Sequence, residues 1–141
     1  MYDGKTLLAV ITARGGSKRM PGKNLATLEG RPLLAWSIDA ARKSKYLDRV
    51  ILSSDDDEII RVAREHGCEA PFKRPPELST DTAKSEDVLI HALDELGAYD
   101  YVVLLQPTSP LRTAEDIDGC VELAVGRRAK SCITVSKVDQ H

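Results

Sequence analysis

Four short apolar runs, separated by stretches with helical periodicity, limit this chain to a small set of folds. The runs are Leu7–Thr12, Val50–Ser53, Tyr101–Leu105 and Cys132–Val135, and a weaker fifth candidate is Glu69–Phe72. They are rich in leucine or β-branched residues and almost continuously apolar, as is typical of strands buried on both faces. Strands that alternate with helices favour a mainly parallel sheet covered by helices on both sides. We therefore predict an α/β fold with three layers, α/β/α, of the Rossmann-like kind.

Helical patterns fill the intervals between these runs, and their ends carry recognisable signals. The helices are expected from Pro32 to about Ser44, from Ser54 to Gly67, over Glu86–Leu96 with Gly97 behind it, and from Thr113 to about Gly126. Proline suits a first helical turn, and Ser54 is the expected cap of the second helix. Thr113 and Asp116 have the spacing of a capping box. At least one helix thus separates successive strands, as parallel pairing requires.

Length and composition indicate one ordinary folded domain. The chain has 141 residues, 42% of them hydrophobic and 30% charged, which is typical of a soluble globular protein. A net charge of −2 gives no reason to expect a nucleic-acid or membrane partner. Neither a signal peptide nor an apolar run of membrane-spanning length is visible, so we expect a cytoplasmic protein.

No group of side chains has the spacing of a metal site. Cys68, Cys120 and Cys132 are odd in number and lack a C-x-x-C pair, so we expect plain buried thiols. The acidic run Asp55–Glu58 is better explained by favourable charge at a helix start, because consecutive carboxylates on a helix cannot all face one ion.

A basic, glycine-rich segment follows the first strand directly. Between Arg14 and Leu28 the chain carries no acid and four cations, namely Arg14, Lys18, Arg19 and Lys23. The adjacent Gly15 and Gly16 let backbone N–H groups approach an anion closely, and an arginine can fork onto phosphate oxygens. This composition fits a nucleoside triphosphate, and a solvated basic loop is the alternative.

Two common phosphate-binding motifs do not describe this segment. A Walker A motif has four residues between its first glycine and the Gly-Lys pair, followed by Ser or Thr. Here five residues separate Gly16 from Gly22, and Asn24 follows Lys23. The G-x-G-x-x-G pattern of dinucleotide-binding folds is also missing.

The run ARGGSKRMPGKN resembles instead the signature of the acylneuraminate cytidylyltransferases, the CMP-sialic acid synthetase family. The resemblance continues in the same order through VILSSDDDEI, RPPELSTDTAKS and LLQPTSPLR. It implies a nucleotidyltransferase fold and a transfer of CMP from CTP to a nine-carbon, nonulosonic sugar acid, with release of pyrophosphate. N-acetylneuraminic, legionaminic and pseudaminic acids are equally compatible with these motifs.

The resemblance also implies roles for particular residues. Lys23 is the expected essential catalytic cation, and Arg14 and Lys18 would neutralise phosphate charge. The nucleotide is expected to contact Arg14, Gly15, Gly16, Ser17, Asn24, Arg74 and Ser85. A second serine that some members carry in the middle motif is Ala83 here. Without the family, Arg74 is better explained as a surface charge beside prolines, and Ser85 as a helix N-cap.

In the last motif, Gln106 leaves a strand at the edge where ligands bind, and the resemblance implies that it faces the sugar with Thr108 and Ser109. The alternative is turn chemistry around Pro107 and Pro110. The related Kdo cytidylyltransferases carry an acidic residue in this region, and its absence favours the acylneuraminate branch.

The resemblance implies three further features that these residues do not supply. They are Mg²⁺, whose ligands are expected beyond residue 141, a homodimer of the full-length protein, and a C-terminal part of the enzyme. Residues 1–141 are therefore expected to form one nucleotide-binding domain. Two alternatives remain: a Kdo-type or other sugar nucleotidyltransferase, and a truncated CTP-binding domain without activity.

Overall fold

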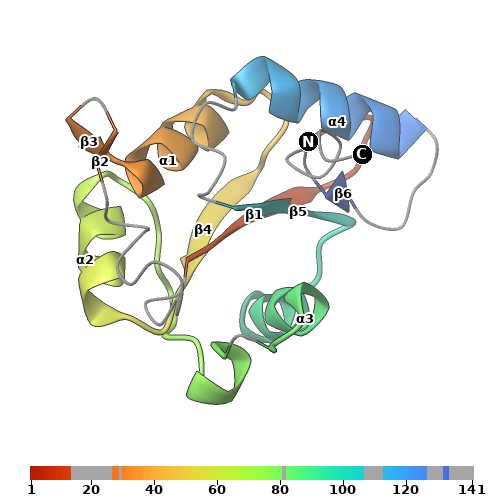
Figure 1. Ribbon diagram of the computed structural model, residues 1–141. Helices are drawn as coiled ribbons and strands as arrows, with labels where there is room; N and C mark the ends of the chain where they lie inside the picture. The colour runs from red at the N-terminus through yellow and green to blue at the C-terminus, as the bar shows by residue number, and fades with distance from the viewer. Residues whose placement is uncertain (14–26, 29, 81, 107–112, 127–131, 134–141) are drawn as a thin grey trace.

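A four-stranded parallel sheet forms the centre of the molecule (Figure 1). The computed structural model describes residues 1–13, 27–28, 30–80, 82–106, 113–126 and 132–133. The sheet consists, in spatial order, of β4 (Arg49–Ser53), β1 (Leu7–Thr12), β5 (Tyr101–Leu105) and β6 (Cys132–Ile133). A hairpin of β2 (Thr27–Leu28) and β3 (Arg31–Pro32) lies outside it. The predicted parallel sheet is confirmed, and two of its strands have the predicted bounds.

Four α-helices and one short 3₁₀ helix connect these strands. They are α1 (Leu33–Lys43), α2 (Asp57–Glu65), η2 (Pro76–Leu78), α3 (Ser85–Leu96) and α4 (Ala114–Gly126). Helices α1 and α4 cover one face of the sheet and α3 covers the other, while α2 lies beside β4 (Figure 1). The three-layer α/β/α arrangement is therefore confirmed.

Alternation along β1 explains why both faces need a cover. Leu7, Ala9 and Ile11 belong to the large apolar cluster with α1, α2 and α4, whereas Leu8 and Val10 belong to a smaller cluster with α3. Successive side chains of a strand point to opposite faces, so a central strand with helices on both sides is apolar throughout. Burial of both faces is the reason why the run that predicted β1 is apolar almost throughout.

The predicted helix-end signal is confirmed at the start of α4 but not at α1 or α2: Pro32 belongs to β3 and precedes the first residue of α1 instead of standing in its first turn. The capping box of α4 is confirmed: the Thr113 N–H donates to Asp116 Oδ2, and the Asp116 N–H donates to Thr113 Oγ1, both at 3.1 Å. The cap of α2 is Asp56 and not Ser54, because Asp56 Oδ1 accepts from the N–H groups of Glu58 and Ile59. The Ser54 hydroxyl accepts one residue earlier, from the Asp56 N–H at 3.1 Å.

The fifth predicted strand, Glu69–Phe72, is wrong as a strand. Only one residue of it pairs with the sheet, through a parallel bridge between Glu69 and Ile51. The Leu52 N–H donates to the Glu69 carbonyl at 2.8 Å, and Arg49 forms an ion pair with the Glu69 carboxylate at 2.8 Å. Proline at position 71 has no N–H to donate to a ladder, so the pairing does not continue.

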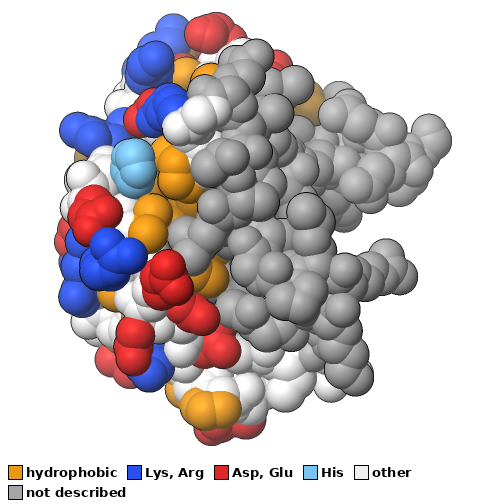
Figure 2. All heavy atoms as spheres, turned by 60° about the vertical axis from the view of Figure 1, so that its left-hand side comes forward, with side chains coloured by type: hydrophobic (Ala, Val, Ile, Leu, Met, Phe, Trp, Pro, Cys, Tyr) orange, Lys and Arg blue, Asp and Glu red, His pale blue; other side chains and the backbone are white. Residues whose placement is uncertain are grey.

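Acidic and basic side chains are interspersed on the α2 side of the molecule, without a large patch of one sign among the described residues there (Figure 2). None of the helices in the described part of the chain combines the length and the apolar character needed to cross a bilayer.

Candidate functional site

Three neighbouring strands deliver predicted site segments to one edge of the sheet. Strand β1 ends just before Ala13, from which the glycine-rich segment departs, and β5 ends just before Gln106. Strand β4 ends at Ser53, whose carbonyl accepts from the Ala13 N–H at 3.1 Å. Since all these strands are parallel, their carboxyl ends meet at the same edge, which is where sheets of this type bind ligands.

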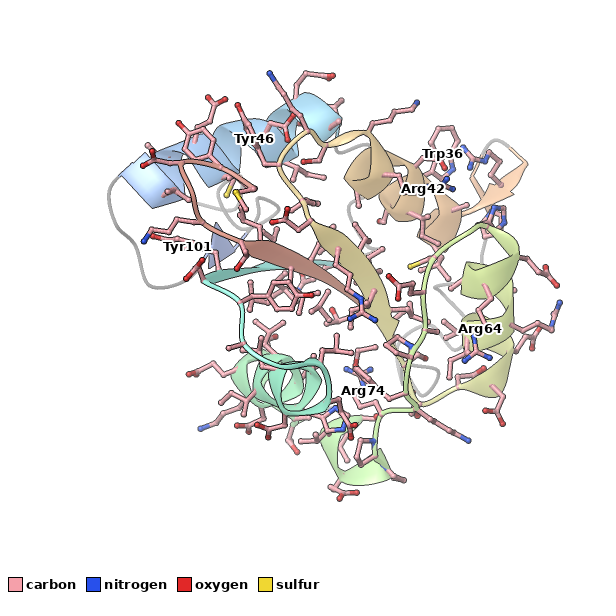
Figure 3. The ribbon with its side chains drawn as sticks, turned by 180° about the vertical axis from the view of Figure 1, so that it is seen from behind. Trp36, Arg42, Tyr46, Arg64, Arg74 and Tyr101 are labelled. Atoms are coloured by element: carbon pink, nitrogen blue, oxygen red, sulfur yellow. The ribbon has the colours of Figure 1, made fainter. Side chains whose placement is uncertain are left out.

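Arg74 reaches this edge along the outer side of β4. From the bridge at Glu69, the chain runs beside β4 to Arg74, whose N–H donates to the Ser54 carbonyl at 2.8 Å. The Arg74 side chain lies between α3 and the carboxyl end of β4 (Figure 3) and is only 4% exposed. The interpretation of Arg74 as a surface charge is therefore wrong. A buried guanidinium at a ligand-binding edge suits recognition of a polar group.

An exposed salt bridge links the residue before Arg74 to the start of α2. Lys73 Nζ lies 3.2 Å from a carboxylate oxygen of Asp57, the first residue of α2. The acidic run after β4 thus caps α2 through Asp56, and its Asp57 forms an exposed ion pair with the residue before Arg74. No local pattern predicts this ion pair, since Asp57 and Lys73 are sixteen positions apart and only the fold brings them together. Among the described residues, no three His, Cys, Asp or Glu side chains are grouped as metal ligands would be.

Ser85 is the first residue of α3, and its side chain is exposed. The cap position belongs to Lys84, which makes no capping hydrogen bond through its side chain, so the N-cap interpretation of Ser85 is wrong. Helix α3 returns the chain to the start of β5, so its N-terminus lies toward the carboxyl edge of the sheet. Ser85 and Arg74 are therefore on the same side of the sheet and at the same edge.

Gln106 is half-buried at the first position after β5. Val102 packs in the α3-side cluster, and alternation from Val102 through Leu104 puts Gln106 on that same face. The other predicted site residues, namely Arg14, Gly15, Gly16, Ser17, Lys18, Lys23, Asn24, Thr108 and Ser109, lie outside the described residues.

The hairpin after the glycine-rich segment is fixed to α1 by one arginine. Arg31 stacks over the Trp36 ring, with its guanidinium carbon 4.9 Å from the ring centroid, and forms a salt bridge with Asp39 at 2.5 Å. Because β2 and β3 pair antiparallel, this contact fixes the point at which the chain returns from the glycine-rich segment. Trp36 and Asp39 are three positions apart and share one face of α1, but Arg31 lies in β3 before the helix, so helical spacing does not predict its contact with them.

The described cysteines differ in environment. Cys68 is buried and Cys120 is partly buried against the large apolar cluster, while nothing is described of the Cys132 side chain. Burial, with a smaller contribution from Glu69, raises the pKa of Cys68 to about 12. The expectation of a plain buried thiol is thus confirmed for Cys68.

Comparisons with known proteins agree with this geometry. The family model "Cytidylyltransferase" matches residues 8–139. Relatives include a pseudaminic acid cytidylyltransferase from Campylobacter jejuni, 42% identical over 87% of this chain and 55% of its own length. A CMP-N,N'-diacetyllegionaminic acid synthase from Legionella pneumophila is 41% identical over 94% of this chain and 58% of its own length. An N-acylneuraminate cytidylyltransferase from Escherichia coli is 37% identical over 90% of this chain and 30% of its own length. The chain therefore spans at most a little over half of these relatives.

One solved structure with the same fold is a CMP:2-keto-3-deoxy-manno-octonic acid synthetase in complex with CTP. It superimposes with a TM-score of 0.76 at 23% identity, over 88% of this chain and 49% of its own length. At this identity the likeness establishes the fold alone.

Proposed function

Because this chain belongs to the cytidylyltransferase family, we propose that it forms the nucleotide-binding region of an enzyme that transfers CMP from CTP to a nonulosonic sugar acid. The observation that carries the proposal is the convergence of motif segments on one edge of a parallel sheet. Ala13 leads into the glycine-rich segment, Arg74 is bound to the Ser54 carbonyl, and Gln106 follows β5. Nucleotides bind at this edge in sheets of this type.

The reaction is a displacement at the α-phosphorus of CTP. A sugar hydroxyl attacks, a bond forms between its oxygen and the α-phosphorus, and the bond to the β-phosphate oxygen breaks, so that pyrophosphate leaves and the hydroxyl proton is released. Catalysis of such a step depends on positioning and on neutralising the developing charge. We assign the neutralising charge to Lys23, Arg14 and Lys18, with Lys23 acting most strongly in the transition state.

The remaining assignments divide the edge between the two substrates. Arg74 and Ser85 contact the base and ribose of CTP, and Gly15, Gly16, Ser17 and Asn24 contact its phosphates. Gln106, with Thr108 and Ser109, contacts the sugar acid. Support comes from the common face of Arg74 and Ser85 at the β4 side of the edge and from Gln106 at its β5 side.

The sugar class rests on the relatives. Those at 41–42% identity are named for pseudaminic and diacetyllegionaminic acids, and a relative at 37% is named for N-acylneuraminate. A Kdo-type enzyme is the alternative, and its support is limited to the shared fold. Mg²⁺, a homodimer and a cytoplasmic location belong to the same proposal. No group of carboxylates in the described part of the chain fits Mg²⁺, so no step is assigned to the ion.

The test is a pyrophosphate-release assay on the longest protein that contains this chain. It uses CTP with N-acetylneuraminic, legionaminic, pseudaminic or Kdo acid as the second substrate. We expect turnover with at least one nine-carbon acid. Turnover with Kdo alone would show a Kdo-type enzyme. CTP binding without any pyrophosphate release would show a CTP-binding domain without activity.

Lys23 and Arg19 provide a matched pair for the mechanism. Lys23→Ala is expected to lower kcat about a hundredfold, or about 2.7 kcal/mol, with a much smaller change in CTP affinity, because the lost interaction acts in the transition state. Lys23→Arg should restore little, since a planar fork does not replace a compact ammonium. Arg19→Ala should have little effect. Equal losses in Lys23→Ala and Arg19→Ala would show a diffuse basic patch instead of a specific cation.

A further inference from the structure

A row of polar side chains crosses three neighbouring strands at the carboxyl edge. Thr12 of β1 is paired with Ser53 of β4, and Gln106 follows Leu105, which is paired with Ile11. In each strand these residues continue the series that faces α3, which includes Val10 in β1 and Ile51 in β4. Thr12, Ser53 and Gln106 therefore share the α3 side of the sheet.

Ser53 differs from the other members of the row. It is fully buried, and within the described part of the chain its Oγ has no hydrogen-bond partner. The neighbouring Ser54 is equally buried, but its Oγ accepts from the Asp56 N–H. A buried hydroxyl without a partner is destabilising, and Ser53, unlike the equally unpartnered Ser37, lies at the ligand-binding edge of the sheet, so its Oγ is available to a group from outside the described residues.

The position of Ser53 identifies the part of the ligand that it would meet. Ser54 binds the Arg74 backbone, so Ser53 lies at the end of the row next to Arg74, on the side where α3 begins with Ser85. Gln106 lies two strands away, at roughly 10 Å for strands about 4.8 Å apart. Ser53 is thus on the nucleotide side of the edge and away from the sugar side.

We propose that Ser53 is a further nucleotide-binding residue, whose hydroxyl forms a hydrogen bond with the nucleoside part of bound CTP. This inference rests on the proposed function. A neutral, buried hydroxyl suits a base or ribose, which are neutral, better than a triphosphate, which needs cations.

The test compares two buried serines whose hydroxyls have no partner among the described residues. Ser53→Ala is the test variant, and Ser37→Ala is the control, since Ser37 lies on α1 at the other face of the sheet and is also buried.

Binding of CTP and of inorganic tripolyphosphate is measured by calorimetry, and the melting temperature is measured without ligand. Ser53→Ala should weaken CTP binding about three- to tenfold and leave tripolyphosphate binding unchanged. Its melting temperature without ligand should be unchanged or higher, because the lost hydroxyl had no partner to stabilise it.

Other outcomes overturn the inference. They are CTP affinity equal to that of the parent protein, an equal loss in Ser37→Ala, or an equal loss for tripolyphosphate. A lower melting temperature without ligand would indicate a structural role. Ser53→Cys, which is slightly larger than serine but leaves no cavity and is only a weak hydrogen-bond donor, then repeats the comparison. Failure of the parent protein to bind CTP would instead overturn the proposed function.

Discussion

The Cys68 thiol illustrates how burial can dominate the chemistry of one side chain. Burial raises its pKa from 9.0 to about 12, so that very little of the reactive thiolate exists at pH 8 in the folded protein. We predict that iodoacetamide does not modify Cys68 at pH 8 in the native protein and modifies it readily in urea, as measured by mass spectrometry of peptides. Modification at the same rate in both states would show that this thiol is accessible.

The same pKa shift has a consequence for stability at high pH. The unfolded chain releases the Cys68 proton near pH 9, whereas the folded chain retains it up to about pH 12. Stability therefore falls as the pH rises through this range. A Cys68→Ala variant, compared by urea denaturation at pH 8 and pH 10, should show a smaller fall than the parent protein.

Arg74 shows how far a single residue can be interpreted from sequence. Its charge and the adjacent prolines favour a surface position, yet the side chain is 4% exposed. Its burial depends on the bridge at Glu69 and on the hydrogen bond to the Ser54 carbonyl. Ser54 is twenty residues upstream of Arg74, and only the fold brings the two together. Resemblance to a family indicated a site role for Arg74, whereas local chemistry did not.

Among the elements, α4 offers the clearest test of a local signal. Thr113 and Asp116 satisfy each other's backbone N–H groups at the start of this helix. Thr113→Ala should destabilise the protein by about 1 kcal/mol, because it removes the hydroxyl that accepts from the Asp116 N–H. The measurement is urea denaturation at pH 7. Ser85→Ala is the matched control, since Ser85 begins α3 without capping it, and its stability should change little. Equal losses in both variants would mean that the capping box is not special.

Elements that depend on local patterns could be predicted, and those that depend on neighbours could not. Strands β1 and β5 agree with their predicted bounds because near-continuous apolar runs mark strands buried on both faces. The cap of α2 was misassigned because Ser54 and Asp56 can both cap, and the Ser54 hydroxyl accepts from the Asp56 N–H instead. Glu69–Phe72 has strand composition but only one paired residue, which composition alone does not reveal.

At the scale of the whole molecule, parallel topology is what assembles the candidate site. Each parallel strand ends at the same edge, so Ala13, Ser53 and Gln106 come together although they are distant in the sequence. The sequence predicted that ligand-binding segments follow the strands. It could not predict that Ser53 and Gln106 share the α3 face with Arg74, because that follows from register and from the path of the chain beside β4.

The response of the whole domain to nucleotides tests its base preference. A ligand that binds only the native state stabilises it by RT ln(1 + [L]/Kd), about 2.7 kcal/mol at a hundredfold excess over Kd, which raises the melting temperature of a domain of this size by on the order of 10 °C. We predict that CTP raises the melting temperature more than UTP, ATP or GTP at equal concentration. The phosphates of all four are alike, so a difference must come from residues that contact the base, such as Arg74 and Ser85.

The measurement is differential scanning calorimetry with equal Mg²⁺ in every sample, and tripolyphosphate reports the contribution of phosphate alone. Equal shifts for the four nucleotides would leave a triphosphate binder without preference for cytosine.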